Sequence, residues 1–307
     1  MAPIQNVAIL GGTGSLGEVL VPELLKAEFN VTCITRPGSK AILPKGVITK
    51  SADYTDHKSL TAALENQDAL VEAFNPAASA HQELILKSAS AAGVRHIITP
   101  DFSGDTFHPR ISELLIFEPK LRAKRQLETI IAQSEGKLTW TAIITGPWFD
   151  WTIETGIFWV NKEKRTIYRY GSGDQKCSMS RRALNGEALV AVLKNPERFQ
   201  NRPAYFASHT VSTNELIAVV KELGLEGWST VDVPIKGHHE EALRLWEEDS
   251  ANGVEDRLGS KAYPMLSTVA LLNEENRYGA DFSQKVEPGW DEGKDALKES
   301  LKKLLSS

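Results

Sequence analysis

Short apolar runs alternate along the first half of the chain with segments in which apolar residues recur at helical spacing. The runs typical of buried strands are "NVAIL", "NVTCIT", "GVITKS", "DALVEAF", "VRHIITP" and "LTWTAIITG". Helical spacing occupies residues 15–28, "SLTAALEN", "HQELILKSASAAG" and residues 111–136, where Pro119 breaks or restarts the helix. This alternation with short connections predicts an α/β fold built on a Rossmann-type, doubly wound parallel sheet.

The pattern changes after Gly146 and Pro147. Aromatic residues cluster in "PWFDWTIETGIFW", and the segments that follow are shorter and less regular. We therefore expect a first domain over residues 1–150 and a smaller, mixed α/β domain over residues 151–307. The last segment, "DEGKDALKESLKKLLSS", predicts an amphipathic helix, with its leucines on one side: Leu297, Leu301, Leu304 and Leu305.

Composition narrows the class of protein. Of the 307 residues, 41% are hydrophobic and 24% are charged, which is ordinary for a globular protein. The net charge of −5 argues against nucleic acid as the main partner, because phosphate binding favours a basic excess. Cys33 and Cys177 do not suggest a disulfide framework, and we find neither a signal-peptide pattern nor an apolar run of about 18 residues. We expect a cytoplasmic monomer or homodimer that binds no membrane.

Three glycines follow the first predicted strand at regular spacing. Gly11, Gly14 and Gly17 form G-x-x-G-x-x-G between a strand and a helix. The first glycine suits a tight turn, the second lets a phosphate approach the backbone, and the third lets the helix pack closely. The loop therefore predicts a dinucleotide site, to which the intervening residues also belong: Thr13, Ser15 and Leu16.

The end of the second strand indicates which dinucleotide binds. An acidic residue there would bind the ribose hydroxyls of NAD, but the chain has Arg36 with Lys40 close behind. A guanidinium pairs well with the 2′-phosphate of NADP, so we predict NADP(H). The alternative is an exposed basic turn without a ligand. Asp53, after the third strand, is predicted to lie near the adenine.

One sequence match to the tyrosine–lysine pair of short-chain dehydrogenases is rejected. Tyr54 and Lys58 have the Y-x-x-x-K spacing, but they follow the third strand rather than the fifth. We interpret "ADYTDHKSL" as a loop that caps the next helix. His238 and His239 are adjacent, so they point in different directions on a helix, and we predict no metal site.

Four segments resemble those of a known family. The chain is similar to the atypical short-chain dehydrogenases of the isoflavone, pinoresinol-lariciresinol and phenylcoumaran benzylic ether reductase group. It is more similar still to the fungal NmrA-like proteins called CipA-like. The resemblance covers about the first 160 residues and is carried by "GGTGSLG", "ITPDFSGD", "FEPKLRAKRQLE" and "TWTAIITGPWFDW".

The resemblance implies roles for several residues. The family's catalytic lysine falls on Lys120, which would lie near the nicotinamide and help hold the cofactor or move a proton. Phe74 and Asn75 would run along the cofactor, and Phe102 would flank the nicotinamide. The alternatives are a solvated basic helix face for Lys120 and ordinary strand-end packing for the others. The chain departs from the family at Pro119, where an aliphatic residue is expected, and in the glycine position of "DFSG".

The aromatic cluster after the sixth strand predicts the substrate site. Ligands of open α/β sheets bind beyond the carboxyl ends of the strands, where aromatic walls suit a flat, apolar molecule. The cluster comprises Trp148, Phe149, Trp151, Phe158 and Trp159. Some of these side chains could instead fill a core.

Two functions from different classes fit these features. The first is an NADPH-dependent reductase of a small aromatic or conjugated molecule, in secondary metabolism by resemblance. The second is a non-catalytic NADP-binding redox sensor of the NmrA type, which would bind a protein partner. An isomerase or dehydratase without net redox change is a third possibility. Lys120 at the family's catalytic position favours the enzyme.

Overall fold

A seven-stranded sheet combines six strands from the first half of the chain with one strand from the second half. The computed structural model describes residues 3–74, 80–255 and 257–306. The strand order is β10-β6-β5-β4-β1-β2-β3, and the neighbours from β6 to β3 pair in parallel. The strands are β1 Asn6–Leu10, β2 Asn30–Thr35, β3 Ile48–Ser51, β4 Ala69–Glu72, β5 His96–Ile98, β6 Thr139–Ile144 and β10 Arg202–Tyr205. The order reverses between β1 and β4, which confirms the predicted Rossmann-type sheet.

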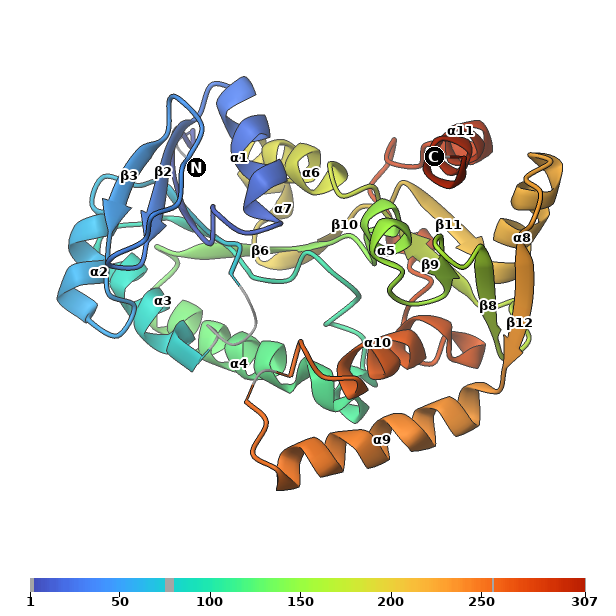
Figure 1. The fold of residues 1–307 in the computed structure, drawn as a ribbon. Helices are drawn as coiled ribbons and strands as arrows, with labels where there is room; N and C mark the ends of the chain where they lie inside the picture. The colour runs from blue at the N-terminus through green and yellow to red at the C-terminus, as the bar shows by residue number, and fades with distance from the viewer. Residues whose placement is uncertain (1–2, 75–79, 256, 307) are drawn as a thin grey trace. The chain divides into compact units, whose positions relative to one another are not determined.

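Helices cover both faces of this sheet (Figure 1). One face carries α1 (Gly17–Lys26) and α6 (Leu184–Lys194), and the other carries α2 (His57–Leu64), α3 (Gln82–Ala91) and α4 (Glu118–Gln133). The short α7 spans Pro196–Phe199. A Cβ on Gly186 of α6 would lie 2.5 Å from the carbonyl oxygen of Val19 on α1, so the glycine lets the two helices pack closely.

Pro119 restarts the helix, as the sequence predicts. Two 3-10 turns, η2 (Ile111–Glu113) and η3 (Leu115–Phe117), precede α4, which begins at Glu118. Pro119 therefore lies in the first turn, where its missing N–H leaves no hydrogen bond unmade.

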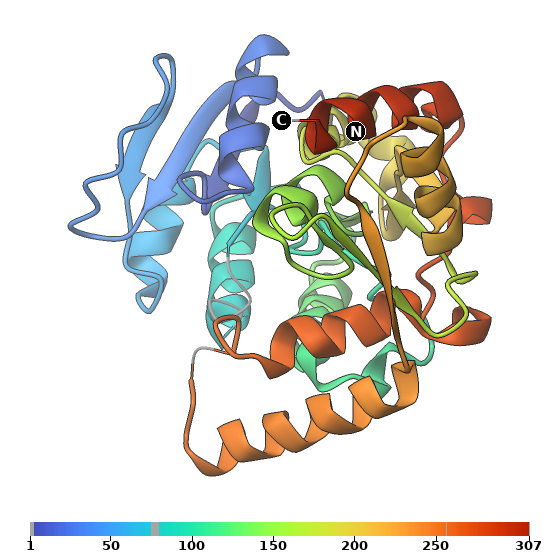
Figure 2. The same cartoon turned by 45° about the vertical axis from the view of Figure 1, so that its right-hand side comes forward.

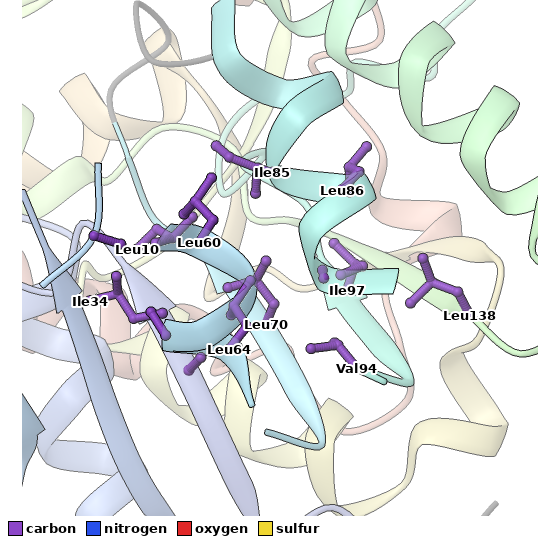
Figure 3. Close-up of a cluster of buried hydrophobic side chains, with 14 of the residues drawn as sticks. Leu10, Ile34, Leu60, Leu64, Leu70, Ile85, Leu86, Val94, Ile97 and Leu138 are labelled. Atoms are coloured by element: carbon purple, nitrogen blue, oxygen red, sulfur yellow. The ribbon is translucent and has the colours of Figure 1, made fainter. Parts of the chain in front are cut away.

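A hydrophobic cluster fills the space between the sheet and the helices α2, α3 and α4. Figure 3 shows leucine and isoleucine side chains from the sheet meeting those of α2 and α3. The fully buried members include Leu10, Leu60, Leu64, Leu70, Ile85, Leu86 and Ile97. Leu70 lies on β4, which pairs with β1 and β5, so its side chain is enclosed by strands and helices together.

The chain divides into two compact units that are interleaved in sequence. Unit 1 comprises residues 1–102, 118–144 and 183–204, and unit 2 comprises residues 103–117, 145–182 and 205–307. This arrangement differs from the single division expected at residue 150. The physical reason is that α6 and β10, which complete the sheet, follow the aromatic segment rather than precede it.

Unit 2 contains two small sheets. In the first, β8 (Thr166–Tyr170) pairs in parallel with β12 (Ser229–Val233) and antiparallel with β7 (Val160–Asn161). In the second, β9 (Lys176–Met179) pairs antiparallel with β11 (His209–Ser212). The remaining elements are α5 Phe149–Thr155, α8 Thr213–Glu222, α9 Ile235–Ala251, α10 Ala262–Leu272, η4 Glu274–Asn276, η5 Ser283–Lys285 and α11 Gly293–Leu305. The long α9 runs beside α10, as Figures 1 and 2 show.

The carboxy-terminal helix has the predicted amphipathic character. Leu297, Leu301 and Leu305 of α11 are buried in the hydrophobic core of unit 2, and Leu304 packs against that core while half-buried. None of the helices in the described part of the chain combines the length and the apolar character that crossing a bilayer requires.

The core cluster predicts a large effect of truncating Leu70. Leu70→Ala should lower the free energy of unfolding by about 2–5 kcal/mol, because it removes buried methyl groups and leaves a cavity. Urea denaturation of the two proteins measures this difference. Ile42→Ala is the control, since the Ile42 side chain is 97% exposed, and it should change stability by less than about 0.5 kcal/mol. Equal effects of the two substitutions would contradict the assignment of Leu70 to the core.

Candidate functional site

The loop between β1 and α1 packs tightly at two of its glycines. Gly11 has φ +84°, and a Cβ there would collide with the backbone carbonyl of Ala73, just after β4. A Cβ on Gly17 would collide with the backbone of Gly12. The turn and the helix packing therefore require these two glycines for reasons internal to the protein, as the sequence predicts.

Gly14 is different, because no contact among the described residues requires a glycine there. Its φ is not positive, and the nearest atom to a Cβ would be the carbonyl oxygen of Gly11, at 3.5 Å. Thr13, Gly14 and Ser15 are exposed, and Leu16 is half-buried where α1 begins. The loop thus presents an open backbone face at a helix N-terminus, an arrangement that suits a phosphate.

Basic side chains follow β2 at the same end of the sheet. Arg36 and Lys40 are exposed, and the Ser39 backbone N–H donates to the Arg36 carbonyl at 3.2 Å to form a turn. Tyr54 donates its hydroxyl to the Ile34 carbonyl at 2.9 Å. Burial raises the pKa of Tyr54 to about 12, while the charge of Arg36 opposes that rise. The Tyr54 hydroxyl is thus occupied by the backbone.

Asp53 lies in a turn beside this region. Its carboxylate accepts from the backbone N–H of Thr55 at 2.9 Å and from the Thr55 hydroxyl at 2.7 Å. These hydrogen bonds lower the pKa of Asp53, which stays ionised on the surface. Lys58, in the first turn of α2, is exposed. The Asp56 side chain accepts from the backbone N–H of Lys58 at 2.9 Å as the N-cap of α2, so the segment caps a helix, as we interpret it from sequence.

The residues after β4 and β5 differ in exposure. Phe74 is half-buried, and Asn75 lies outside the residues that the structure describes. Phe102 is only 2% exposed and has φ +38°, a conformation that is uncommon for a residue with a side chain. Its backbone N–H donates to the Ile143 carbonyl at 2.8 Å, which ties the segment after β5 to β6.

Lys120 points toward the end of β5. Its Nζ donates to the backbone carbonyl of Asp101 at 2.7 Å. Burial lowers the pKa of Lys120, and the carboxylate of Asp101 partly opposes that fall. Arg122 and Arg125 of the same helix are exposed. Lys120 is half-buried, unlike Arg122 and Arg125, and a lysine with a lowered pKa gives up its proton more readily than a surface lysine.

A buried carboxyl group at the end of β4 was missed by the sequence analysis. Glu72 is 0% exposed, and Gln82 of α3 donates its Nε2 to both carboxyl oxygens, at 2.9 and 2.7 Å. Burial raises the pKa of Glu72 to about 8; the Asp101 charge adds to the rise and the Gln82 hydrogen bond opposes it. The signal in the sequence was an acidic residue inside the apolar run "DALVEAF".

The aromatic cluster of unit 2 separates into core and surface side chains. Phe149 and Trp159 are 2% and 3% exposed and belong to a hydrophobic core, against which Phe158 packs. Trp148 and Trp151 are half-buried, with ring centroids 6.1 Å apart in an edge-on arrangement. The second pair therefore offers aromatic surface, whereas the first pair stabilises the unit.

Asp105, the last residue of the motif "ITPDFSGD", anchors part of unit 2. Its carboxylate accepts from Lys285 at 2.8 Å, from the Tyr205 hydroxyl at 3.1 Å and from the Phe107 backbone N–H at 3.0 Å. The group is thus saturated by partners within the protein. Within residues 3–74, 80–255 and 257–306, no His, Cys, Asp and Glu side chains gather into a set that could hold a metal ion.

Comparison with known proteins gives four relevant similarities. A family model described as NAD(P)H-binding matches residues 11–196. The oxidoreductase poxI of Penicillium oxalicum is 29% identical over 217 residues, which cover 70% of this chain and 69% of that protein. An isoflavone reductase homologue of Arabidopsis thaliana, P3, is 23% identical over 70% of this chain and 73% of its own length. Among solved structures, AtPrR2 with NADP+ and (+)-pinoresinol superimposes with a TM-score of 0.66 at 18% identity, covering 80% of this chain and 83% of that one.

The different environments of Gly14 and Gly17 predict separable effects of adding a methyl group. Gly17→Ala should destabilise the fold, because its Cβ meets the backbone of Gly12. Gly14→Ala should leave the melting temperature within about 2 °C of the parent but weaken NADPH binding about tenfold or more, since the methyl group blocks the approach of a phosphate. Thermal melts and NADPH fluorescence titrations measure both effects. A Gly14→Ala protein with unchanged affinity would place the phosphates elsewhere.

Proposed function

The chain belongs to the NAD(P)H-binding family, and we propose that it is an NADPH-dependent reductase of a small aromatic or conjugated molecule. The observation that carries the proposal is Lys120, a desolvated lysine held on the carbonyl of Asp101 at the carboxyl end of the parallel sheet. A lysine of this kind can hold or move a proton beside a bound dinucleotide.

The residues of unit 1 fit a dinucleotide, and those after β2 favour NADP(H). The open face of the loop at Gly14 suits a pyrophosphate at the N-terminus of α1. β2 ends at Thr35 and is followed by Arg36, so no carboxylate stands there to bind the ribose hydroxyls of NAD. Arg36 and Lys40 are exposed and offer donors to a 2′-phosphate. AtPrR2, a protein of similar fold, was solved with NADP+.

The proposed reaction divides between the cofactor and this chain. When bound, a reduced nicotinamide supplies a hydride to an electrophilic carbon of the substrate. Lys120 supplies the accompanying proton from Nζ to the substrate's heteroatom, directly or through water. Burial favours this transfer, because it lowers the pKa of Lys120. The carbonyl of Asp101 keeps the ammonium in place by accepting a hydrogen bond at 2.7 Å.

An aromatic substrate is supported by the surface tryptophans. Trp148 and Trp151 present two half-buried rings at the start of α5. We assign substrate contact to this pair rather than to Phe149 or Trp159, which are core side chains. Pinoresinol, the ligand that AtPrR2 was solved with, is an aromatic molecule of the class proposed here.

The reductase proposal predicts that Lys120 is needed for turnover but not for folding. NADPH oxidation would be followed over a panel of phenolic ethers, enones and quinone-like aromatics. Lys120→Ala should reduce kcat by about 100-fold or more on any substrate that the parent reduces, since the proton donor is lost. The melting temperature and NADPH affinity of the variant establish that it is folded and loaded.

Other outcomes of the same experiment distinguish the alternatives. Turnover that survives the substitution would keep the reductase and remove Lys120 from its mechanism. Tight NADPH binding by the parent with no oxidation of NADPH on any compound would favour the non-catalytic redox sensor. Conversion of a substrate without consumption of NADPH would favour an isomerase or dehydratase.

The cofactor assignment predicts a loss of selectivity when Arg36 is changed. Arg36→Ala should weaken NADPH binding by about tenfold while changing NADH affinity by less than about twofold, because only NADPH carries the 2′-phosphate. Kd values for both dinucleotides measure the selectivity. Arg122→Ala is the matched control, an exposed arginine on α4 that should leave the ratio unchanged. Parallel losses for NADPH and NADH would contradict the assignment.

A further inference from the structure

Glu72 is a buried carboxyl group at the point where the strand order of the sheet reverses. It is the last residue of β4 and pairs in register with Leu10, the last residue of β1. The next residue, Ala73, donates its N–H to the Leu10 carbonyl at 2.8 Å and presents its own carbonyl to Gly11 of the loop. Glu72 is thus the neighbour in sequence of Ala73, whose contact with Gly11 positions the glycine loop.

The described residues around Glu72 supply no cation that would compensate a negative charge on it. Its side chain is 0% exposed, and its only hydrogen-bond donor among the described residues is the neutral amide of Gln82 on α3. The charged group that acts on it is another carboxylate, Asp101, on the segment after β5. Lys120 donates to the backbone carbonyl of Asp101. A buried carboxylate without a cationic partner favours its neutral form, and its pKa is accordingly raised to about 8.

The Gln82 amide can serve either protonation state of this carboxyl group. Its Nε2 donates to both oxygens of the ionised form. Its Oε1 is buried and has no donor in the part of the chain that the structure describes. A half-turn of the amide would offer that oxygen as an acceptor to the O–H of a protonated Glu72.

We propose that Glu72 is a residue of the dinucleotide site that admits the cofactor in its protonated, neutral form and weakens binding when it ionises. A dinucleotide brings phosphate charges to the loop at Gly11, Gly14 and Gly17. A second negative charge in the low-dielectric interior beneath that loop repels them. The inference rests on the dinucleotide site and not on the reductase activity.

The sign of the pH dependence follows from this linkage. Below pH 8 Glu72 is mostly neutral, and the affinity for NADPH is at its full value. Above pH 8 Glu72 ionises, and Glu72 must take up a proton again when the anionic ligand binds, which weakens the affinity. The Kd for NADPH should be flat near pH 7 and rise roughly fivefold by pH 9, if binding raises the pKa of Glu72 by about one unit. The titration begins at pH 7 because a phosphate monoester itself titrates near pH 6.

The first experiment compares NADPH titrations of the parent, Glu72→Gln and Glu83→Gln between pH 7 and 9. Glu72→Gln keeps the shape of the side chain without the charge, so its Kd should stay within about twofold over the whole range. Glu83, the next residue on α3 after Gln82, is exposed and pairs with Lys87, so Glu83→Gln should keep the parent's rise. The proposal is overturned if the Kd of Glu72→Gln for NADPH rises with pH as that of the parent does.

Lys120 requires its own variant, because a lysine with a lowered pKa also loses positive charge as the pH rises. Lys120→Met should bind NADPH more weakly at every pH but retain the rise above pH 8. If the Kd of Lys120→Met no longer rises above pH 8 while the Kd of Glu72→Gln still does, the titrating group is Lys120 and the proposal is overturned.

Two measurements keep the test decisive if Glu72→Gln does not fold. Calorimetry of the parent in buffers of different ionisation enthalpy should show uptake of about half a proton per NADPH bound at pH 8.5; no uptake, or release, would overturn the proposal. Gln82→Leu removes the hydrogen bond that lowers the pKa of Glu72, so it should move the rise in Kd about one pH unit higher. If the Kd of Gln82→Leu rises at the same pH as that of the parent, Glu72 is not the titrating group. Both readouts are independent of substrate turnover.

Discussion

The close approach of two strand ends, β1 and β4, is the constraint on which the candidate site depends. Gly11 lies against the carbonyl of Ala73, and the Ala73 N–H donates to Leu10, so no side chain can separate the two strands there. That contact fixes the turn, the turn directs the chain into α1, and α1 begins against the backbone of Gly12.

Three ionisable side chains of the described residues, Glu72, Asp101 and Lys120, belong to this edge of the sheet. Glu72 is the last residue of β4, Asp101 follows the neighbouring β5, and Lys120 of α4 donates to the backbone carbonyl of Asp101. A carbonyl holds the ammonium without neutralising it. Burial lowers the pKa of Lys120, and burial is also the main reason that the pKa of Glu72 is raised, with the charge of Asp101 adding to that rise.

Features set by local chemistry could be predicted from sequence, whereas those set by packing between distant segments could not. The strand–glycine–helix unit and the restart at Pro119 follow from backbone geometry alone. The exposure of individual aromatic residues does not, since Phe149 and Trp151 belong to one short helix and only the three-dimensional core distinguishes them. Glu72 was read as part of an apolar strand because its burial depends on α3, ten residues further along the chain. The boundary expected at residue 150 ignored α6 and β10, which return to the sheet after an excursion of 38 residues over 145–182.

This interleaving has a consequence for how the protein can be divided or varied. A fragment that ends at residue 150 would lack β10, so the edge of β6 would be unpaired. It would also lack Gly186 of α6, so the surface of α1 that packs on this glycine would be exposed. We therefore expect that such a fragment would not fold independently. Insertions in the connections between β7, β8 and β9, by contrast, would lengthen a segment whose two ends are joined to unit 1 and would leave the core side chains of α5 in place. Evolution could therefore enlarge these connections while inheriting the nucleotide-binding framework unchanged.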